Sequence, residues 1–312
     1  MKNYSYTKSA ALAAQINVVE KLRSTVLLTP IMPAQELQLQ WTALLNHIHY
    51  SLAFKGISLQ TNYINNLFSP TLKKSLTLQD KIAIEYKKAL DMLYHEWLGN
   101  EKQVTVNDLK SLYALGFRGK VKASDEEVNR ILQYVQLNAE HPTIQAALAQ
   151  FLILDEQPFS EDNERFSHLV LLLFLYKSGY DFKRLLVPEE YFFTHIVAYR
   201  DTVGISSRQA NLTFWLEYVT DGIVFLLNKI NNTIINTKQN WSPTDILLKL
   251  NTRQQSILSL LEKPGIKISN KTVQHEFAVS QITASRDLSK LASLGLITPL
   301  GKGRSTYYTK ER

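Results

Sequence analysis

Apolar residues recur at helical spacing through most of the chain. Early in the sequence, one helical face is formed by Val18, Val19, Leu22 and Val26, and another by Leu44, Leu45, Ile48 and Leu52. The same period predicts later helices over residues 80–98, 107–115, 126–137, 141–154, 163–178, 188–202 and 212–232. Strand patterns are almost absent in this part. The pattern therefore predicts a mainly α fold that begins with an all-helical domain over residues 1–238.

A polar stretch at residues 231–243 interrupts this pattern and predicts a domain boundary. The second domain, residues 243–312, has a different order of elements: three short helices and then a hairpin. The predicted helix starts are Thr252, Ser269 or Asn270, and Ser280. The predicted strands cover residues 296–298 and 306–308, with glycines in the turn between them. This order predicts a small α+β domain of the winged helix-turn-helix kind.

The third of these helices, residues 281–294, has two distinct sides. Its buried side is predicted to hold Ala284, Leu288, Leu291 and Ala292. The opposite side carries hydrogen-bond donors and cations, as does the turn of the hairpin, and both suit contact with base edges and phosphates. The predicted DNA-contacting residues are Ser280, Gln281, Thr283, Ser285, Arg286, Lys290, Lys302 and Arg304.

The charge distribution supports this interpretation. The net charge is +7, and residues 242–312 carry 11 Lys or Arg against 5 Asp or Glu, whereas the rest of the chain carries 24 against 23. A concentrated basic module is typical of proteins that bind the phosphate backbone, so double-stranded DNA is the expected partner. One such module buries little surface on DNA, which favours a homodimer on paired half-sites. A winged helix that contacts protein is the open alternative.

Several classes of site are disfavoured by composition. The chain has no cysteine, which excludes disulfides, thiolate nucleophiles and zinc–thiolate sites. Its seven histidines are scattered and no H-E-x-x-H motif occurs, so no metal site is expected. The most apolar run, residues 169–176, is far shorter than the roughly 20 residues that span a bilayer. We therefore expect no membrane contact, and the N-terminus, which lacks the apolar core of a signal peptide, favours a cytoplasmic location.

Residues 141–165 resemble the Fic family, whose motif H-P-F-x-[DE]-G-N-G-R lies between two helices. The helix that begins at His141-Pro142 is similar to the one before that motif, and residues 157–165 read QPFSEDNER. Four positions match the motif and a fifth falls at its acidic position: Pro158, Phe159, Asn163, Arg165 and Glu161. Many members also end in a winged helix. The resemblance implies N-terminal helices over residues 1–75 and a Fic core over about residues 76–238.

The family's chemistry depends on positions that differ here. Fic enzymes usually transfer AMP from ATP to a protein hydroxyl, with the motif His as general base and the two motif glycines around the phosphates. Those positions are Gln157, Asp162 and Glu164 in this chain. An amide cannot accept a proton near neutral pH. Two like charges 4 Å apart interact by about 4 kcal/mol at an effective dielectric of 20, so the carboxylates should repel ATP. The resemblance therefore implies no catalysis and no cofactor.

The segment Ser51-Leu-Ala-Phe-Lys55-Gly56 lies where many family members carry an inhibitory helix of sequence [ST]-x-x-x-E-[GN]. The family's Glu approaches the motif Arg, but here the position is Lys55. A Lys beside Arg165 is tolerable only with a carboxylate close by. We therefore expect Lys55 to lie near Asp162 or Glu164, Arg165 to pair with another of these acids, and the site to be closed and too small for ATP.

These observations predict a transcription-regulatory DNA-binding protein built on a non-catalytic Fic-like domain. A first alternative is a nucleotidyltransferase with a non-standard active site, which would use ATP and Mg²⁺. A second alternative is a scaffold that binds a protein partner in the groove where family members bind their target.

Overall fold

The computed structural model describes residues 2–68, 75–138, 141–239, 250–261, 266–293, 296–301 and 306–309. The chain divides into two compact units. Unit 1 comprises Met1–Thr29 and Leu39–Asn232, and unit 2 comprises Pro30–Gln38 and Thr233–Arg312. Among the described residues, no helix combines the length and apolar character needed to cross a membrane.

Unit 1 is helical, as the apolar periodicity predicts. Its α-helices are α1 (Ala10–Leu28), α2 (Pro33–Phe54), α3 (Thr61–Leu67), α4 (Leu78–Glu96), α5 (Val106–Gly116), α6 (Asp125–Asn138), α7 (Pro142–Glu156), α8 (Asn163–Lys177), α9 (Pro188–Thr194), α10 (Ile196–Gln209) and α11 (Thr213–Gln239). The first residues of α2 and the last residues of α11 belong to unit 2. A single 3₁₀ turn, η1 (Phe182–Arg184), precedes α9.

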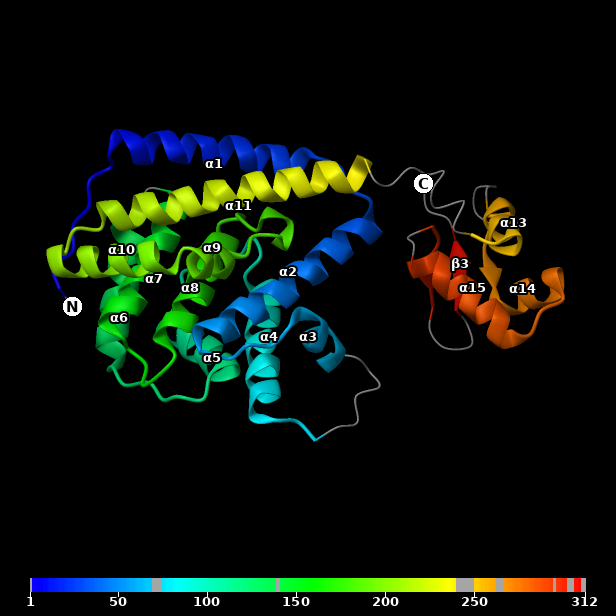
Figure 1. Cartoon of the computed structure of the whole chain (residues 1–312), viewed down its shortest axis with the longest axis horizontal. Helices are drawn as coiled ribbons and strands as arrows, with labels where there is room; N and C mark the ends of the chain where they lie inside the picture. Colours follow the sequence, from blue (N-terminus) through cyan, green and yellow to red (C-terminus); the bar gives the residue numbers. More distant parts are fainter. Residues whose placement is uncertain are drawn as a thin grey trace. The chain divides into compact units, whose positions relative to one another are not determined.

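Helix α8 lies at the centre of unit 1 and packs along α7 and α4. Every residue from Leu169 to Tyr176 is at most 1% exposed, so the most apolar run of the chain is indeed a buried helix. Figure 1 shows α1, in blue, running beside the yellow-green α11. Side-chain hydrogen bonds join these two helices, from Ser9 to Glu217 and from Gln15 to Asp221.

Two sequence predictions for unit 1 are wrong in detail. The helix expected over residues 188–202 is divided at His195 into α9 and α10. There the Thr194 hydroxyl bonds the carbonyl of Glu190 and the His195 ring bonds that of Tyr191, so side chains compete for the last carbonyls of α9. The helix expected to end at residue 232 continues as far as Gln239, because Ile230 and Ile234 continue the buried stripe of α11. The division between the two units nevertheless falls after Asn232, within the polar stretch.

The described residues of unit 2 include three further helices and a small sheet: α13 (Thr252–Leu260), β1 (Ile268–Ser269), α14 (Asn270–Phe277), α15 (Gln281–Ser293), β2 (Thr298–Leu300) and β3 (Tyr307–Thr309). The strands are antiparallel in the order β1-β3-β2, with Tyr308 opposite both Ile268 and Pro299. One apolar core joins the helices to the sheet; among its residues are Leu250, Ile257, Leu258, Leu261, Ile268, Val273, Ala284, Leu288, Leu291 and Ile297.

The sequence predicted three helices and two strands in these residues, but β2 and β3 lie two residues and one residue later than the predicted strands. It missed β1, which is two residues long and too short for a periodic pattern. The first of these helices is capped by Asn251 rather than by Thr252. Asn251 accepts from the backbone N–H of Gln254, whose side chain in turn accepts from the N–H of Asn251. Ser269 caps α14, as expected.

Candidate functional sites

The first candidate site is the loop between α7 and α8, which corresponds to the Fic-like motif. Helix α7 ends at Gln157 with φ 46°, and α8 begins after Asp162 with φ 57°, so both residues have left-handed backbone conformations. Asp adopts this conformation more readily than most non-glycine residues, which allows it to replace the glycine found at this position in the resembling motif. The backbone of the loop is thus formed without glycine.

Asn163 holds the loop together. Its side-chain oxygen accepts from the N–H of Phe159 at 3.0 Å, and its side-chain nitrogen donates to the carbonyl of Phe159 at 2.8 Å. The Phe159 ring is 1% exposed and stacks on Tyr113 with ring centroids 4.0 Å apart. Asn163 and Phe159 therefore fix the backbone conformation of the loop.

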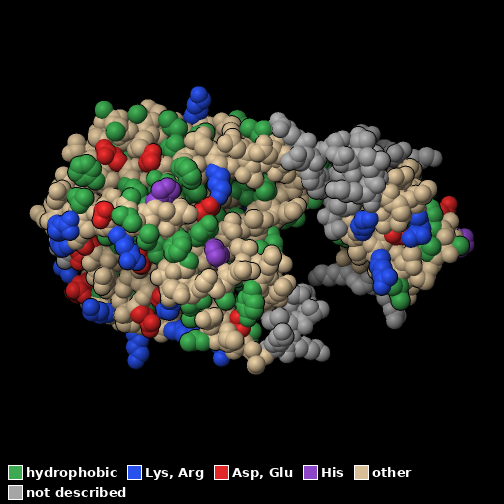
Figure 2. Space-filling model, viewed as in Figure 1, with side chains coloured by type: hydrophobic (Ala, Val, Ile, Leu, Met, Phe, Trp, Pro, Cys, Tyr) green, Lys and Arg blue, Asp and Glu red, His purple; other side chains and the backbone are tan. Residues whose placement is uncertain are grey.

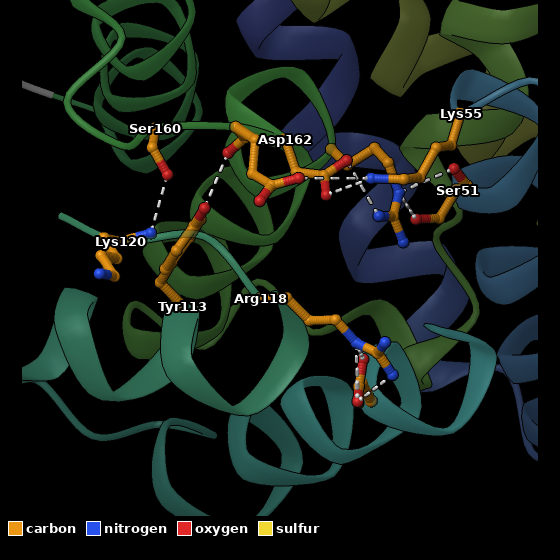
Figure 3. Close-up of polar contacts among 10 residues, drawn as sticks. Ser51, Lys55, Tyr113, Arg118, Lys120, Ser160 and Asp162 are labelled. Atoms are coloured by element: carbon orange, nitrogen blue, oxygen red, sulfur yellow. Dashed lines mark hydrogen bonds and ion pairs between the residues drawn. The ribbon is translucent and has the colours of Figure 1, made fainter. Parts of the chain in front are cut away.

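A neighbouring extended segment, residues 118–123, pairs with the loop along its backbone. Ser160 N donates to the carbonyl of Lys120 at 2.8 Å, and Lys120 N donates to the Ser160 hydroxyl at 2.8 Å (Figure 3). The Tyr113 hydroxyl donates to the carbonyl of Glu161 at 2.8 Å. The sequence analysis missed this pairing, because a short bridge between residues about 40 apart leaves no periodic pattern.

Lys55, Asp162 and Arg165 form an ion cluster beside the loop. Lys55 Nζ lies 2.6 Å from Asp162 Oδ2 and 4.0 Å from Glu161 Oε2 (Figure 3). This confirms the predicted contact between Lys55, in the turn directly after α2, and the motif loop. We expected Arg165 to pair with a different acid, and this expectation is wrong. Its Nη1 lies 3.1 Å from Oδ1 of the same Asp162. One carboxylate can serve both cations because each approaches a different oxygen.

Arg165 is bound from several directions. It is 2% exposed, and its Nε donates to the carbonyl and to the hydroxyl of Ser51 in α2, each at 3.0 Å. Ser51 is fully buried, and Gly56 ends the turn after α2 with φ 72°. The segment predicted as an inhibitory helix therefore contacts the motif loop through both Ser51 and Lys55.

The acids of the loop titrate differently. Burial acts to raise the pKa of the Asp162 carboxyl, but Arg165 and Lys55 outweigh it, so this pKa lies below its ordinary value. Burial raises the pKa of Glu164, and Arg200 only partly offsets the increase. Asp162 therefore keeps its negative charge to lower pH than an ordinary aspartate, whereas Glu164 takes up a proton more readily than an ordinary glutamate. Gln157 is exposed at the mouth of the loop and provides no general base.

A surface hollow of about 350 Å³ remains beside the cluster. Its lining residues are Phe54, Lys55, Gln157, Ser160, Glu161, Asp162, Asn163, Glu164 and Arg165. We expected the site to be closed and too small for ATP, and this expectation is wrong. Lys55 lines the hollow without filling it, and the volume that remains is within the range of small-molecule pockets. What opposes a phosphate here is charge: three carboxylates line the hollow and both cations are already bound to Asp162.

Behind Arg165 lies a buried polar network that the sequence analysis did not identify. Glu189 accepts from the Tyr86 hydroxyl at 2.7 Å and lies 2.8 Å from His47 Nδ1, and all three side chains are fully buried. Burial lowers the pKa of the neighbouring His168 to about 4. His47 and Glu189 are 142 residues apart in sequence, so only the folded chain brings them together.

The second candidate site is the outer face of α15. Ser280, Gln281, Ser285, Arg286 and Lys290 are exposed, and Thr283 is half-buried with its N–H donating to the Ser280 hydroxyl. Figure 2 shows Lys and Arg side chains, in blue, on the unit that carries this helix. Lys302 and Arg304, which were also predicted to contact DNA, lie outside the described residues.

Helix α15 is anchored from behind by an acid that the sequence analysis did not single out. Asp287 is 4% exposed; its two oxygens accept from Arg253 Nε at 2.6 Å and from Gln254 Nε2 at 2.7 Å, both in α13. The acid nearest to Arg286 in sequence therefore faces inward, and the outer face keeps its positive character. Ile282, which was also missed, is 65% exposed on that outer face.

No protein-family model matches this sequence, and no curated protein matches it. Solved structures, however, match the fold. A Fic family protein from Desulfovibrio desulfuricans G20 has a TM-score of 0.65 at 13% identity, over 99% of this chain and 98% of that chain. Two structures of Fic-1 from C. elegans, one of them a variant, have TM-scores of 0.59 and 0.58 at 16% identity, over 73% and 70% of this chain and 74% and 71% of those chains. The chain therefore has a Fic-like fold.

Proposed function

We propose that this chain is a DNA-binding, transcription-regulatory protein whose Fic-like domain does not transfer nucleotides. The observation that carries the proposal is the outer face of α15. An exposed row of hydroxyl, amide and cationic side chains lies on the last of three short helices, which pack on a three-stranded antiparallel sheet. This arrangement supports a winged helix-turn-helix domain, in which the equivalent helix would enter the major groove.

The face of α15 suits duplex DNA in charge and in geometry. Arg286 has the planar fork of donors that binds guanine in two places, and Lys290, one turn further on, suits a phosphate. In the sequence, Lys302 and Arg304 fall between β2 and β3, where the wing of such a domain contacts the backbone or the minor groove. The proposal includes a homodimer that binds two half-sites, because one such domain buries little surface on DNA. It also includes a location in the cytoplasm.

The test is a fluorescence-anisotropy titration of the full chain with random duplex DNA at increasing salt. We expect an affinity that falls steeply with salt, because bound cations displace counterions. Lys302→Ala should weaken binding to all duplexes alike, whereas Arg286→Ala should reduce the preference for selected sequences. If the full chain binds no duplex even at low salt, the proposal is wrong.

The non-catalytic part of the proposal rests on Gln157 and on the two acids of the loop. With radiolabelled ATP and Mg²⁺, the purified chain should label neither itself nor a cell lysate. Gln157→His should not restore labelling, because Asp162 and Glu164 still occupy the place of a phosphate cradle. Label transfer by the unmodified chain contradicts this part of the proposal while leaving DNA binding untouched.

A second candidate function is a nucleotidyltransferase that uses ATP and Mg²⁺ at the same loop. The observation that favours it is the hollow of about 350 Å³ lined by Asn163, Arg165 and Glu161. The residues present do not suit the phosphates, because Asp162 and Glu164 line the hollow and Lys55 is bound to Asp162. Isothermal titration with ATP and Mg²⁺ separates the two functions. Binding heat that saturates at one site supports the nucleotidyltransferase, and the absence of binding heat supports the non-catalytic regulator. A protein partner in the hollow is the third possibility, and it would bind without nucleotide.

A further inference from the structure

An isoleucine lies at the centre of the outer face of α15. Ile282 is 65% exposed. Among the described residues from Leu250 to Thr309, one other large apolar side chain is exposed to solvent: Ile266, with 36% of its surface accessible. A single exposed apolar residue is common on protein surfaces and needs no explanation by itself. The position of Ile282 relative to its neighbours is what gives it meaning.

Helix geometry places Ile282 directly opposite the core. With 3.6 residues per turn, Ser285, Arg286 and Ser289 lie on the same side as Ile282, and all three are exposed. The residues on the opposite side, Ala284, Leu288 and Leu291, are fully buried. The side chain of Ile282 is therefore an apolar group surrounded by hydrogen-bond donors, in the first turn of the helix.

The major-groove edge of DNA has the same mixture of chemistry. Bases present donors and acceptors there, and thymine adds a C5-methyl group that apolar side chains contact. In helix-turn-helix proteins, residues near the N-terminus of the recognition helix reach these edges. Ile282 occupies that part of α15, and Arg286 lies four residues further on, about 6 Å along the axis.

We propose that Ile282 packs on a thymine methyl group and so helps to determine which sequence this chain prefers. The thymine lies within about two base pairs of the guanine that Arg286 contacts, because base pairs are spaced by 3.4 Å. This inference rests on the proposed DNA-binding function and adds one specificity-determining residue to it. It commits the outer face of α15 to DNA rather than to a protein surface.

The experiment compares thymine with deoxyuridine, which lacks only the methyl group. A duplex is selected from a random library with the full chain, and each thymine is then replaced in turn by deoxyuridine. For the unmodified chain we expect one position per half-site at which the replacement weakens binding about fourfold, the value of one buried methyl group. For Ile282→Ala the same replacement should have no effect, whereas for Ile266→Ala, the matched control, it should keep its full effect.

The outcomes separate this inference from the proposed function. If a duplex is selected but no thymine is sensitive, or if the sensitivity persists in Ile282→Ala, the inference is wrong and DNA binding stands. If duplexes bind without any sequence being enriched, the inference is also wrong, and only a phosphate-backbone interaction stands. If no duplex binds at low salt, both proposals fail. A circular-dichroism unfolding curve of Ile282→Ala that matches the curve of the unmodified chain confirms that the variant is folded.

Discussion

The ion cluster beside the loop between α7 and α8 and the outer face of α15 each contain two cations, yet the cations have opposite surroundings. In the loop, Lys55 and Arg165 are both bound to Asp162, and Arg165 is 2% exposed. On α15, Arg286 and Lys290 are exposed. The first pair is bound within the protein's own structure, and the second lies at the surface of unit 2. The comparison shows that the bonding of a charge, more than its presence in a motif, indicates what it does.

The comparison predicts opposite responses to mutation in the two regions. Changes in the loop should alter folding stability and leave DNA binding unchanged, and changes on α15 should do the reverse. Four experiments test this division. The fluorescence of Trp97 and Trp215, both fully buried in unit 1, reports the unfolding of the region that contains the loop.

Arg165→Met should have the largest effect. It removes the partner of Asp162 and two hydrogen bonds to Ser51, and removal of one partner from a buried ion pair costs about 3 to 5 kcal/mol of unfolding free energy. We expect a value near the lower end, because Asp162 keeps Lys55. The measurement is urea unfolding at pH 7. Arg118→Met is the matched control: Arg118 binds Glu85 through two nitrogens but is exposed, and its loss should leave the midpoint unchanged.

His168→Phe should change how stability depends on pH. The folded pKa of His168 is about 4, below its ordinary value of 6.5, so as the pH falls from 7 the unfolded chain binds the proton first. This group therefore lowers the stability of the unmodified chain by about 3 kcal/mol between pH 7 and pH 4. The variant should lose less stability over the same range. Identical pH profiles for the two proteins would show that His168 is not held neutral.

Arg286→Ala should weaken binding to the selected duplex by about 2 kcal/mol, roughly thirtyfold, while its urea midpoint stays the same. An exposed arginine contributes little to the free energy of unfolding. A lower stability of Arg286→Ala would therefore contradict the division of the two regions into one that stabilises the fold and one that binds DNA. Lys21→Ala is the control for net charge, since Lys21 is exposed on α1. If Lys21→Ala weakens binding as much as Arg286→Ala does, binding follows overall charge and not the face of α15.

Asp162→Asn should have a smaller effect than Arg165→Met, a loss of about 2 kcal/mol at pH 7, because the amide oxygen still accepts from Arg165 but no carboxylate balances the buried guanidinium. Asn also tolerates the left-handed backbone at this position. The folded pKa of Asp162 lies below its ordinary value, so its contribution is present above about pH 4 and is lost as the pH falls further. The difference between the two proteins should therefore become smaller as the pH falls below about 4. A difference that does not change with pH in this range contradicts the ion cluster as its cause.

The sequence was informative where a change at one position required a change at another. Glycine replaced by Asp162, together with glutamate replaced by Lys55, predicted a contact that the structure places at 2.6 Å. Helices with strong periodicity were also predicted to within a few residues. In α11, however, the polar residues from 231 onward were taken to end the helix, although Ile234 continues the buried stripe and the helix ends at Gln239. A polar run on the solvent side of a helix resembles a linker when it is read by composition alone.

What the sequence could not provide were partners far apart in the chain. Glu189 and His47 are 142 residues apart, and neither lies in a recognisable motif. The size of the hollow beside the loop was also misjudged, because the space left by one ion pair depends on the packing of α2 against α8. Ile282 could have been found: on a helical wheel it lies directly opposite Leu291. It was overlooked because apolar residues were assigned to the core and polar residues to the surface.

Asn163 has a consequence for how this loop can evolve. Its amide binds both backbone groups of Phe159, so the path of the chain from residue 159 to residue 163 is fixed by a buried aromatic ring and one side chain. Gln157, Ser160 and Glu161, by contrast, are exposed. Point mutations at those three positions therefore leave intact the two hydrogen bonds and the buried ring that fix this path.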